Sequence, residues 1–140
     1  MLISQICVLS GGILTLVMGV FHTQFYRIFG WRKEFEQIGL TQARIHYTIH
    51  MALLLLFFGI SCLSIAHYRD LVECDDIGFT FMLILSLFWL WRTIWQVIYF
   101  HLPKDQPIQK KRRMHYTLVF IFALLTISYG LPVILSLNPN

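Results

Sequence analysis

Four long segments that are almost free of charge make up most of this 140-residue chain. They cover residues 1–26, 45–68, 77–103 and 114–140, and only Arg92 interrupts them. Each segment exceeds the roughly 20 residues that a helix, rising about 1.5 Å per residue, needs to cross a hydrocarbon core about 30 Å thick. Lipid offers the backbone no hydrogen-bond partners, and the strand-length alternation of a barrel is absent. We therefore expect an all-α integral membrane protein.

The composition agrees with this expectation. The chain is 57% hydrophobic, and its 13% of charged residues are too few to cover the surface of a soluble domain of this size. The first segment has no basic residue before its apolar stretch and no small-residue cleavage pattern, which favours a helix over a signal peptide. Thr41 is the predicted N-cap of the second helix, and Pro132 is predicted to kink the fourth. The connections are too short for a second domain. Residues 1–140 are thus predicted to form one antiparallel four-helix transmembrane bundle, with helices at about 3–29, 41–67, 78–101 and 112–137.

Basic residues separate the two sides of such a bundle. If the chain threads back and forth, connections 27–44 and 104–113 share one side and hold nine of the eleven Lys and Arg residues: Arg27, Arg32, Lys33, Arg44, Lys104, Lys110, Lys111, Arg112 and Arg113. Connection 69–76 carries Arg69 among four acidic residues. The positive-inside rule makes the basic side cytoplasmic and puts both termini on the non-cytoplasmic side. We expect a plasma membrane location, by default the bacterial inner membrane.

The expected partners follow from the same features. The "KKRR" run at 110–113 is typical of topogenic charge beside anionic lipid, and the stacking aromatics of a nucleic-acid interface are missing. We therefore expect a lipid bilayer and no nucleic acid. Gly12 and Gly19 share a face that lets another helix approach, in a membrane partner or a second copy. Cys62 and Cys74 fall on the outer side, where a disulfide between them is allowed, although buried thiols are preferred.

Five of the six histidines are predicted to lie toward the cytoplasmic side: His22, His46, His50, His101 and His115. Two of them match in depth. His22 is five residues from Arg27, about 7 Å, and His50 is six from Arg44, about 9 Å. His101 is the weakest member, because nine residues separate it from Arg92 and turn it to the opposite face of its helix.

Each predicted helix carries a polar stripe, found by stepping about 100° per residue. Polar stripes in spanning helices should turn inward. The expected inward sets are Gly11, Thr15 and His22; His46, His50, Ser61 and Ser64; Arg92, Gln96 and Tyr99; and His115, Thr126 and Tyr129.

Arg92 is predicted to lie near the middle of the bilayer, where an arginine costs at least about 3 kcal/mol on insertion scales. No acidic residue lies within a span, so its partners are neutral side chains such as Gln96, carbonyls, water or an acidic ligand. The aromatic run "FWLWRTIW" around it is interpreted as interfacial belt and lipid-facing surface.

Imidazoles gathered from several helices suit haem iron and the transition metals. A b-type haem needs two axial imidazoles from different helices at one depth, which His22 and His50 provide, and Arg27, Arg44 or Arg113 suit its propionates. This general plan is similar to that of small four-helix membrane cytochromes b, although no motif of a family is present. A bare metal ion held by His46 and His50 with His22 or His115 is the close variant.

Several functions remain open from the sequence. The sharpest hypothesis is a haem- or metal-binding membrane protein, an electron-transfer or oxidoreductase component, with His22, His50 and Arg92 binding the cofactor. A carrier or channel that uses Arg92 for an anionic solute is one alternative, and a non-catalytic accessory subunit docking through Gly12 and Gly19 is another. Histidines that merely anchor the helices at the interface fit equally well. No catalytic residue is predicted.

Overall fold

The structure is a computed structural model that describes residues 1–28, 31–73, 76–100 and 108–137, without the side chains of 32–34 and 108–111. Within these ranges every regular element is a helix. Four helices are long and apolar enough to cross a membrane: α1 (Leu2–Thr23), α4 (Leu40–Ala66), α6 (Asp76–Ile98) and α7 (Ile108–Leu137), the last from Arg112 onward. The prediction of an all-α, multi-pass membrane protein is confirmed to this extent.

Two short helices occupy connections that the sequence analysis left irregular, α3 (Trp31–Ile38) and α5 (Tyr68–Glu73). A third short helix, α2 (Phe25–Ile28), forms the end of the first predicted helix. The first predicted helix, 3–29, is therefore broken after Thr23. Thr41 does not cap α4, because the helix starts after Gly39, whose φ of 83° is in a region that glycine adopts at little cost. Helix α7 continues through Pro132 without interruption.

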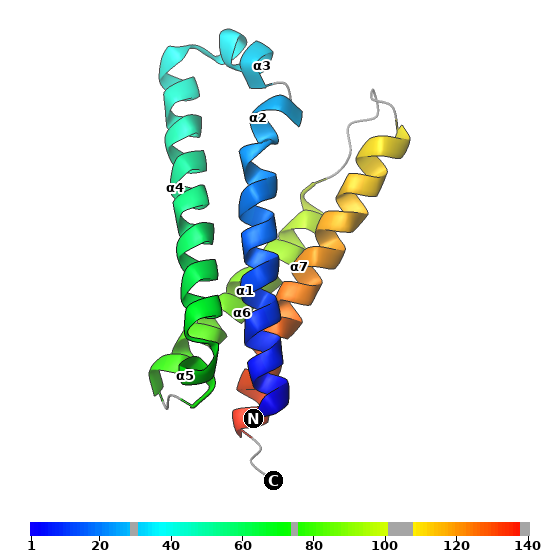
Figure 1. The fold of residues 1–140 in the computed structure, drawn as a ribbon. Helices are drawn as coiled ribbons and strands as arrows, with labels where there is room; N and C mark the ends of the chain where they lie inside the picture. The colour runs from blue at the N-terminus through cyan, green and yellow to red at the C-terminus, as the bar shows by residue number, and fades with distance from the viewer. Residues whose placement is uncertain (29–30, 74–75, 101–107, 138–140) are drawn as a thin grey trace.

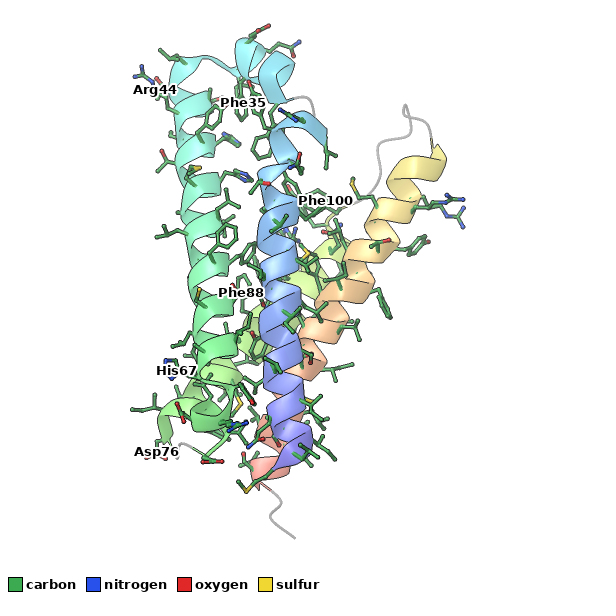
Figure 2. The ribbon with its side chains drawn as sticks, viewed as in Figure 1. Phe35, Arg44, His67, Asp76, Phe88 and Phe100 are labelled. Atoms are coloured by element: carbon green, nitrogen blue, oxygen red, sulfur yellow. The ribbon has the colours of Figure 1, made fainter. Side chains whose placement is uncertain are left out.

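Helix α1 holds the assembly together. It packs against α4 on one side and α7 on the other, while α6 packs chiefly against α7 and crosses behind α1 (Figure 1). The N- and C-terminal ends of the chain lie at the same end of the molecule (Figure 1). Arg44 and Phe35 lie at the opposite end of the molecule from His67 and Asp76 (Figure 2). The basic and acidic connections are therefore at opposite ends of the long helices.

The core lies where α1, α6 and α7 meet. Its fully buried side chains include Val8, Met18, Trp89, Leu125 and Tyr129. Lipid tails are as apolar as these side chains, so close packing between helices stabilises the fold more than apolar burial does.

Small residues let α1 and α4 approach. A Cβ at Gly12 would lie 2.9 Å from Ser64 Cβ and from Ile65 Cγ1, closer than carbon atoms tolerate. A Cβ at Gly19 would meet Phe57 and Phe58 at 3.5 Å. Helix α4 of the same chain thus covers the face that the sequence analysis offered to a partner, so an accessory subunit would have to dock elsewhere.

Candidate functional site

Two histidines from different helices meet near the basic end of the molecule. His22 belongs to the last turn of α1, and His50 lies three turns into α4. Their ring centroids are 5.6 Å apart and their planes are 18° from parallel, and both side chains are half-buried. We call these two residues the histidine pair. The sequence analysis placed both at one depth, and the structure brings them together.

The protonation pattern of His22 follows from its backbone contact. Its Nδ1 lies 3.2 Å from the carbonyl oxygen of Met18, which can only accept, so Nδ1 carries the proton and donates. The lone pair of His22 is therefore on Nε2. A ring nitrogen that donates to a carbonyl while the other stays free is the arrangement that orients histidine for a metal.

Aromatic side chains surround the histidine pair. Phe25 of α2 stacks on His22 with centroids 4.1 Å apart, and Phe57 of α4 meets the same ring edge to face at 5.0 Å. Trp31 of α3 meets His50 at 5.0 Å. Cofactor sites are typically lined by apolar and aromatic side chains around a few polar groups. The sequence analysis missed this lining, because neither the break between α1 and α2 nor helix α3 was predicted.

His46 is placed outside this cluster, contrary to the inward stripe expected for it. Its side chain is exposed, its Nδ1 donates to the carbonyl oxygen of Gln42 at 2.9 Å, and its ring lies 5.9 Å from Phe35. The reason is that this end of α4 is met by the short helices α2 and α3, through Tyr26 and Phe35, and no long helix in the described residues covers His46. Tyr99 is also exposed, at 66%, because α6 ends at Ile98.

His115 lies on α7 and pairs with α6 instead of with the other histidines. Its Nδ1 accepts a hydrogen bond from Gln96 Nε2 at 3.3 Å. Among the described residues, no three His, Cys, Asp or Glu side chains come together in one group. The structure thus brings together two of the four predicted metal ligands, while His101 and Cys74 lie outside the described residues.

The geometry of the histidine pair fits a shared metal ion. Two imidazoles bound to one ion at a bent angle, through bonds of about 2.0 Å, have ring centroids about 5 to 6 Å apart, and the 5.6 Å spacing lies in this range. The imidazoles on opposite sides of a haem iron have centroids slightly more than about 6 Å apart, so haem binding would require the two rings to move apart by less than about 1 Å. Two imidazoles from separate helices are also the full protein ligand set of a bis-histidine haem, whereas a bare ion would complete its coordination with water or substrate.

Arg92 lies nearer to the end of α6 than to its start. It is six residues, about 9 Å, from the helix end at Ile98. Its guanidinium carbon lies 4.9 Å from the Phe122 ring and 5.6 Å from the Phe100 ring. Phe57 contacts both His22 and Trp89, and Trp89 is one turn from Arg92 on α6. Arg92 is therefore a half-buried cation one turn of α6 away from the lining of the histidine pair.

Trp89 corrects the interpretation of "FWLWRTIW" as wholly belt and lipid surface. Trp91 and Trp95 are exposed, as that interpretation predicts, but Trp89 is completely buried and stacks on Phe57 and Phe122, each at 5.6 Å. Position 89 lies on the α6 face that packs into the core, which the composition of the run alone does not indicate.

A second polar contact lies deeper between the helices. The hydroxyls of Ser64 on α4 and Tyr129 on α7 are 3.0 Å apart, and both side chains are fully buried. Thr15 of α1 is buried too and donates to the carbonyl oxygen of Gly11 at 2.8 Å. This cluster satisfies its own polar groups, so we assign it to packing.

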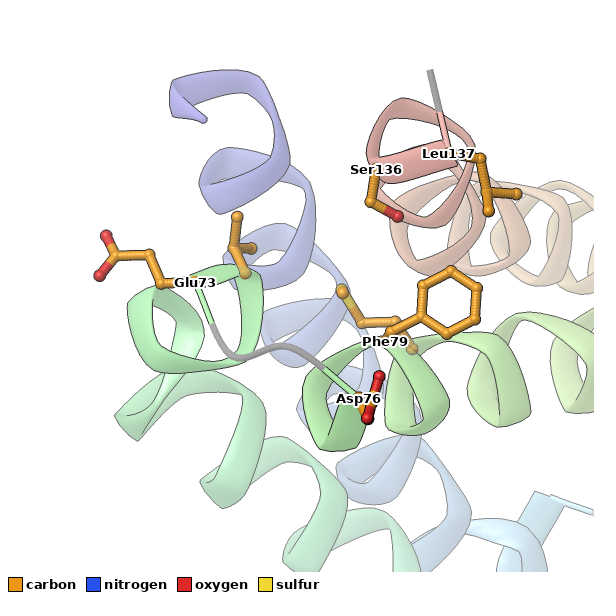
Figure 3. A pocket seen from close by; sticks show the side chains of 7 residues that line it. Glu73, Asp76, Phe79, Ser136 and Leu137 are labelled. Carbon is orange, nitrogen blue, oxygen red and sulfur yellow. The ribbon is translucent and has the colours of Figure 1, made fainter. Parts of the chain in front are cut away.

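A hollow opens at the opposite end of the molecule, between α5, α6 and the end of α7 (Figure 3). Glu73, Asp76 and Ser136 lie along it among apolar side chains. Glu73 already accepts a long hydrogen bond from Gln5, at 3.5 Å. Two exposed carboxylates without a further ligand group do not define a site.

Comparison with known proteins assigns no family. No protein-family profile, curated protein or solved structure matches this chain significantly. Function is therefore inferred from the residues and their geometry.

Proposed function

We propose that this chain is a four-span membrane protein that binds haem b or a transition-metal ion through His22 and His50, as an electron-transfer or oxidoreductase component. The observation that carries the proposal is the contact between the two rings, 5.6 Å apart and contributed by two separate helices. Imidazole nitrogen is a ligand for haem iron, copper and zinc.

Three properties of the surroundings support it. His22 donates through Nδ1 and keeps Nε2 for a ligand bond. The aromatic rings of Phe25, Trp31 and Phe57 provide the apolar walls that a macrocycle packs against. Arg92 is a nearby interior cation, suited to a carboxylate side group of the cofactor. When bound, the group would supply the electron-transfer chemistry, while the chain holds it and excludes water.

We further propose that the four helices thread antiparallel through a plasma membrane, with both termini on the non-cytoplasmic side. The end with Arg44 would face the cytoplasm, because basic residues are retained there. The end with His67 and Asp76 would face outward (Figure 2). The histidine pair would then lie in the cytoplasmic leaflet.

Purified protein provides the test. We expect a Soret band that shifts on reduction, or stoichiometric iron, copper or zinc, in the wild type and in His67→Ala. Both His22→Ala and His50→Ala should lose it, because each removes one of the two ligands. His67 is the control because it lies at the other end and pairs with Asp70 at 3.0 Å. A wild type without pigment or metal, even after incubation with hemin and each ion, would overturn the proposal.

Two alternatives predict different results. A carrier for anionic solutes would give flux in liposomes that is lost in Arg92→Gln, with no pigment or metal required. An accessory subunit would co-purify with a larger membrane complex and be unaffected by His22→Ala. Neither result is expected if the histidine pair is the functional centre.

A further inference from the structure

One face of α6 carries three buried polar atoms that have no hydrogen-bond partner among the described residues: Trp89 Nε1, Arg92 Nη1 and Gln96 Oε1. Trp89 is 0% exposed and Gln96 3%. Their spacing keeps all three within seven residues, about 10 Å along the helix. We call these residues the α6 polar stripe. Buried polar groups nearly always have partners, so three orphans on one face require an explanation.

Within the described part of the chain, no acidic side chain faces Arg92. Glu34 and Glu36 lie in α3, Asp70 and Glu73 lie in α5, and Asp76 is the first residue of α6. Arg92 instead lies over the rings of Phe122 and Phe100. Contact with aromatic faces attracts a cation but leaves its N–H groups without acceptors. An acceptor from outside the chain would complete the set.

The walls of the stripe indicate what kind of molecule brings that acceptor. Phe122 contacts both Arg92 and Trp89, and Phe57 stacks on the other side of Trp89. These walls are apolar. A ligand that suits these groups has an oxyanion at one end and a hydrocarbon body, and the side chains around Trp89 and Gln96 would have to move to admit its head group.

We propose that the α6 polar stripe binds the oxyanion head group, carboxylate or phosphate, of an amphipathic molecule. Arg92 and the Trp89 N–H donate to its oxygens. Gln96 contributes its NH₂ group after its amide turns, so that Oε1 accepts from His115 Nδ1–H, at the position where Nε2 donates in the free protein. This site shares Arg92 with the proposed cofactor site, but it uses neither histidine of the histidine pair and needs no metal or haem.

The test uses the full chain in phosphatidylcholine vesicles and a palmitate that carries a photoreactive diazirine. We expect crosslinking to peptides of α6 or α7. It should fall at least tenfold in Arg92→Gln, which loses the charge, and about threefold in Trp89→Phe, which keeps the ring and loses the N–H. Arg112→Gln is the matched control, because Arg112 is an exposed basic residue on α7. Its labelling should equal that of the wild type.

Competition identifies the head group. Unlabelled palmitate should compete, while methyl palmitate, which has the same chain without charge, should not. Stronger competition by phosphatidylglycerol than by palmitate would identify a phospholipid as the source of the oxyanion. Three results would overturn the proposal. Acetate at equal concentration would compete, methyl palmitate would compete as strongly as palmitate, or the wild type and Arg92→Gln would be labelled equally. If Arg92→Gln does not fold, the test depends on the labelling of Trp89→Phe and on the comparison of palmitate with methyl palmitate as competitors.

His22→Ala keeps this inference separate from the proposed cofactor function. It removes a proposed cofactor ligand and leaves the α6 polar stripe intact, so its palmitate labelling should match the wild type. Loss of pigment or metal with retained labelling is the expected pattern. Loss of labelling in His22→Ala would contradict a separate site.

Discussion

His22 and His50 lie ring against ring between α1 and α4, with planes only 18° from parallel. His46, one turn from His50 on the same helix, lies outside that contact and is bound to its own helix through Gln42. The structure therefore distinguishes two histidines that share a spacing of four residues. Of the two, only His50 contacts the ring of His22.

This distinction gives a first prediction. We expect His46→Ala to retain any haem or metal at the wild-type stoichiometry, and His50→Ala to lose it, because only His50 faces His22. Absorption spectra and metal content of the purified variants, compared at equal helix content by circular dichroism, provide the measurement. Loss in both variants would instead support an ion held by the adjacent histidines of α4.

The depth of the histidine pair was predictable, since counting residues from Arg27 and Arg44 needs only the rise of a helix. The direction of His46 was not. Whether a polar residue turns inward depends on which helix covers it, and the arrangement of α6 and α7 away from this end of α4 depends on long-range packing. The same limit explains why Tyr99 was expected inside and is exposed.

The distribution of charged residues along the sequence located the four spans, but it did not locate the helix ends accurately. The four apolar stretches are visible in the sequence, but α3 and α5 lie in connections of mixed polarity with no long periodic pattern, and the break that separates α2 from α1 has no clear signal in the sequence. The lining of the histidine pair by Phe25 and Trp31 depends on two of these short helices. The burial of Trp89 was not predicted for another reason, because Leu90 and Trp91, which follow it in the sequence, are exposed.

The hydroxyl contact between α4 and α7 gives a second prediction. Tyr129→Phe and Ser64→Ala each remove one partner of the 3.0 Å contact. Hydrogen bonds between membrane helices contribute about 0.6 kcal/mol on average. A double-mutant cycle in the free energy of unfolding, measured by titration with dodecyl sulfate in mixed micelles, should give a coupling of about 0.5 to 1.5 kcal/mol. Additive effects would show that the contact does not stabilise the fold.

Close packing at Gly12 gives a third prediction. Gly12→Ala puts a methyl group 2.9 Å from Ser64 and Ile65, so we expect it to destabilise the chain by about 1 to 3 kcal/mol, the usual cost of overpacking. Gly59→Ala on α4 is the matched control, because nothing lies within 4 Å of its new methyl group. There we expect no loss, and a gain of up to about 1 kcal/mol from helix propensity. Equal effects would mean that α1 and α4 are less closely packed than the structure shows.

The proposed orientation gives the last prediction, which single cysteines can test. With Cys7, Cys62 and Cys74 replaced by Ser, Asp70→Cys in α5 and Gln37→Cys in α3 place one thiol at each end of the molecule, both at exposed positions. Retention of the basic end in the cytoplasm predicts that a membrane-impermeant maleimide labels Asp70→Cys in intact spheroplasts and Gln37→Cys only after lysis.

The reverse pattern would move the histidine pair to the outer leaflet without separating its members. Labelling of both thiols in intact spheroplasts would be more serious, because two ends of one bundle cannot face the same compartment. In that case the chain would not cross the membrane four times, and α1 and α4 would have to meet in some way other than as adjacent spans.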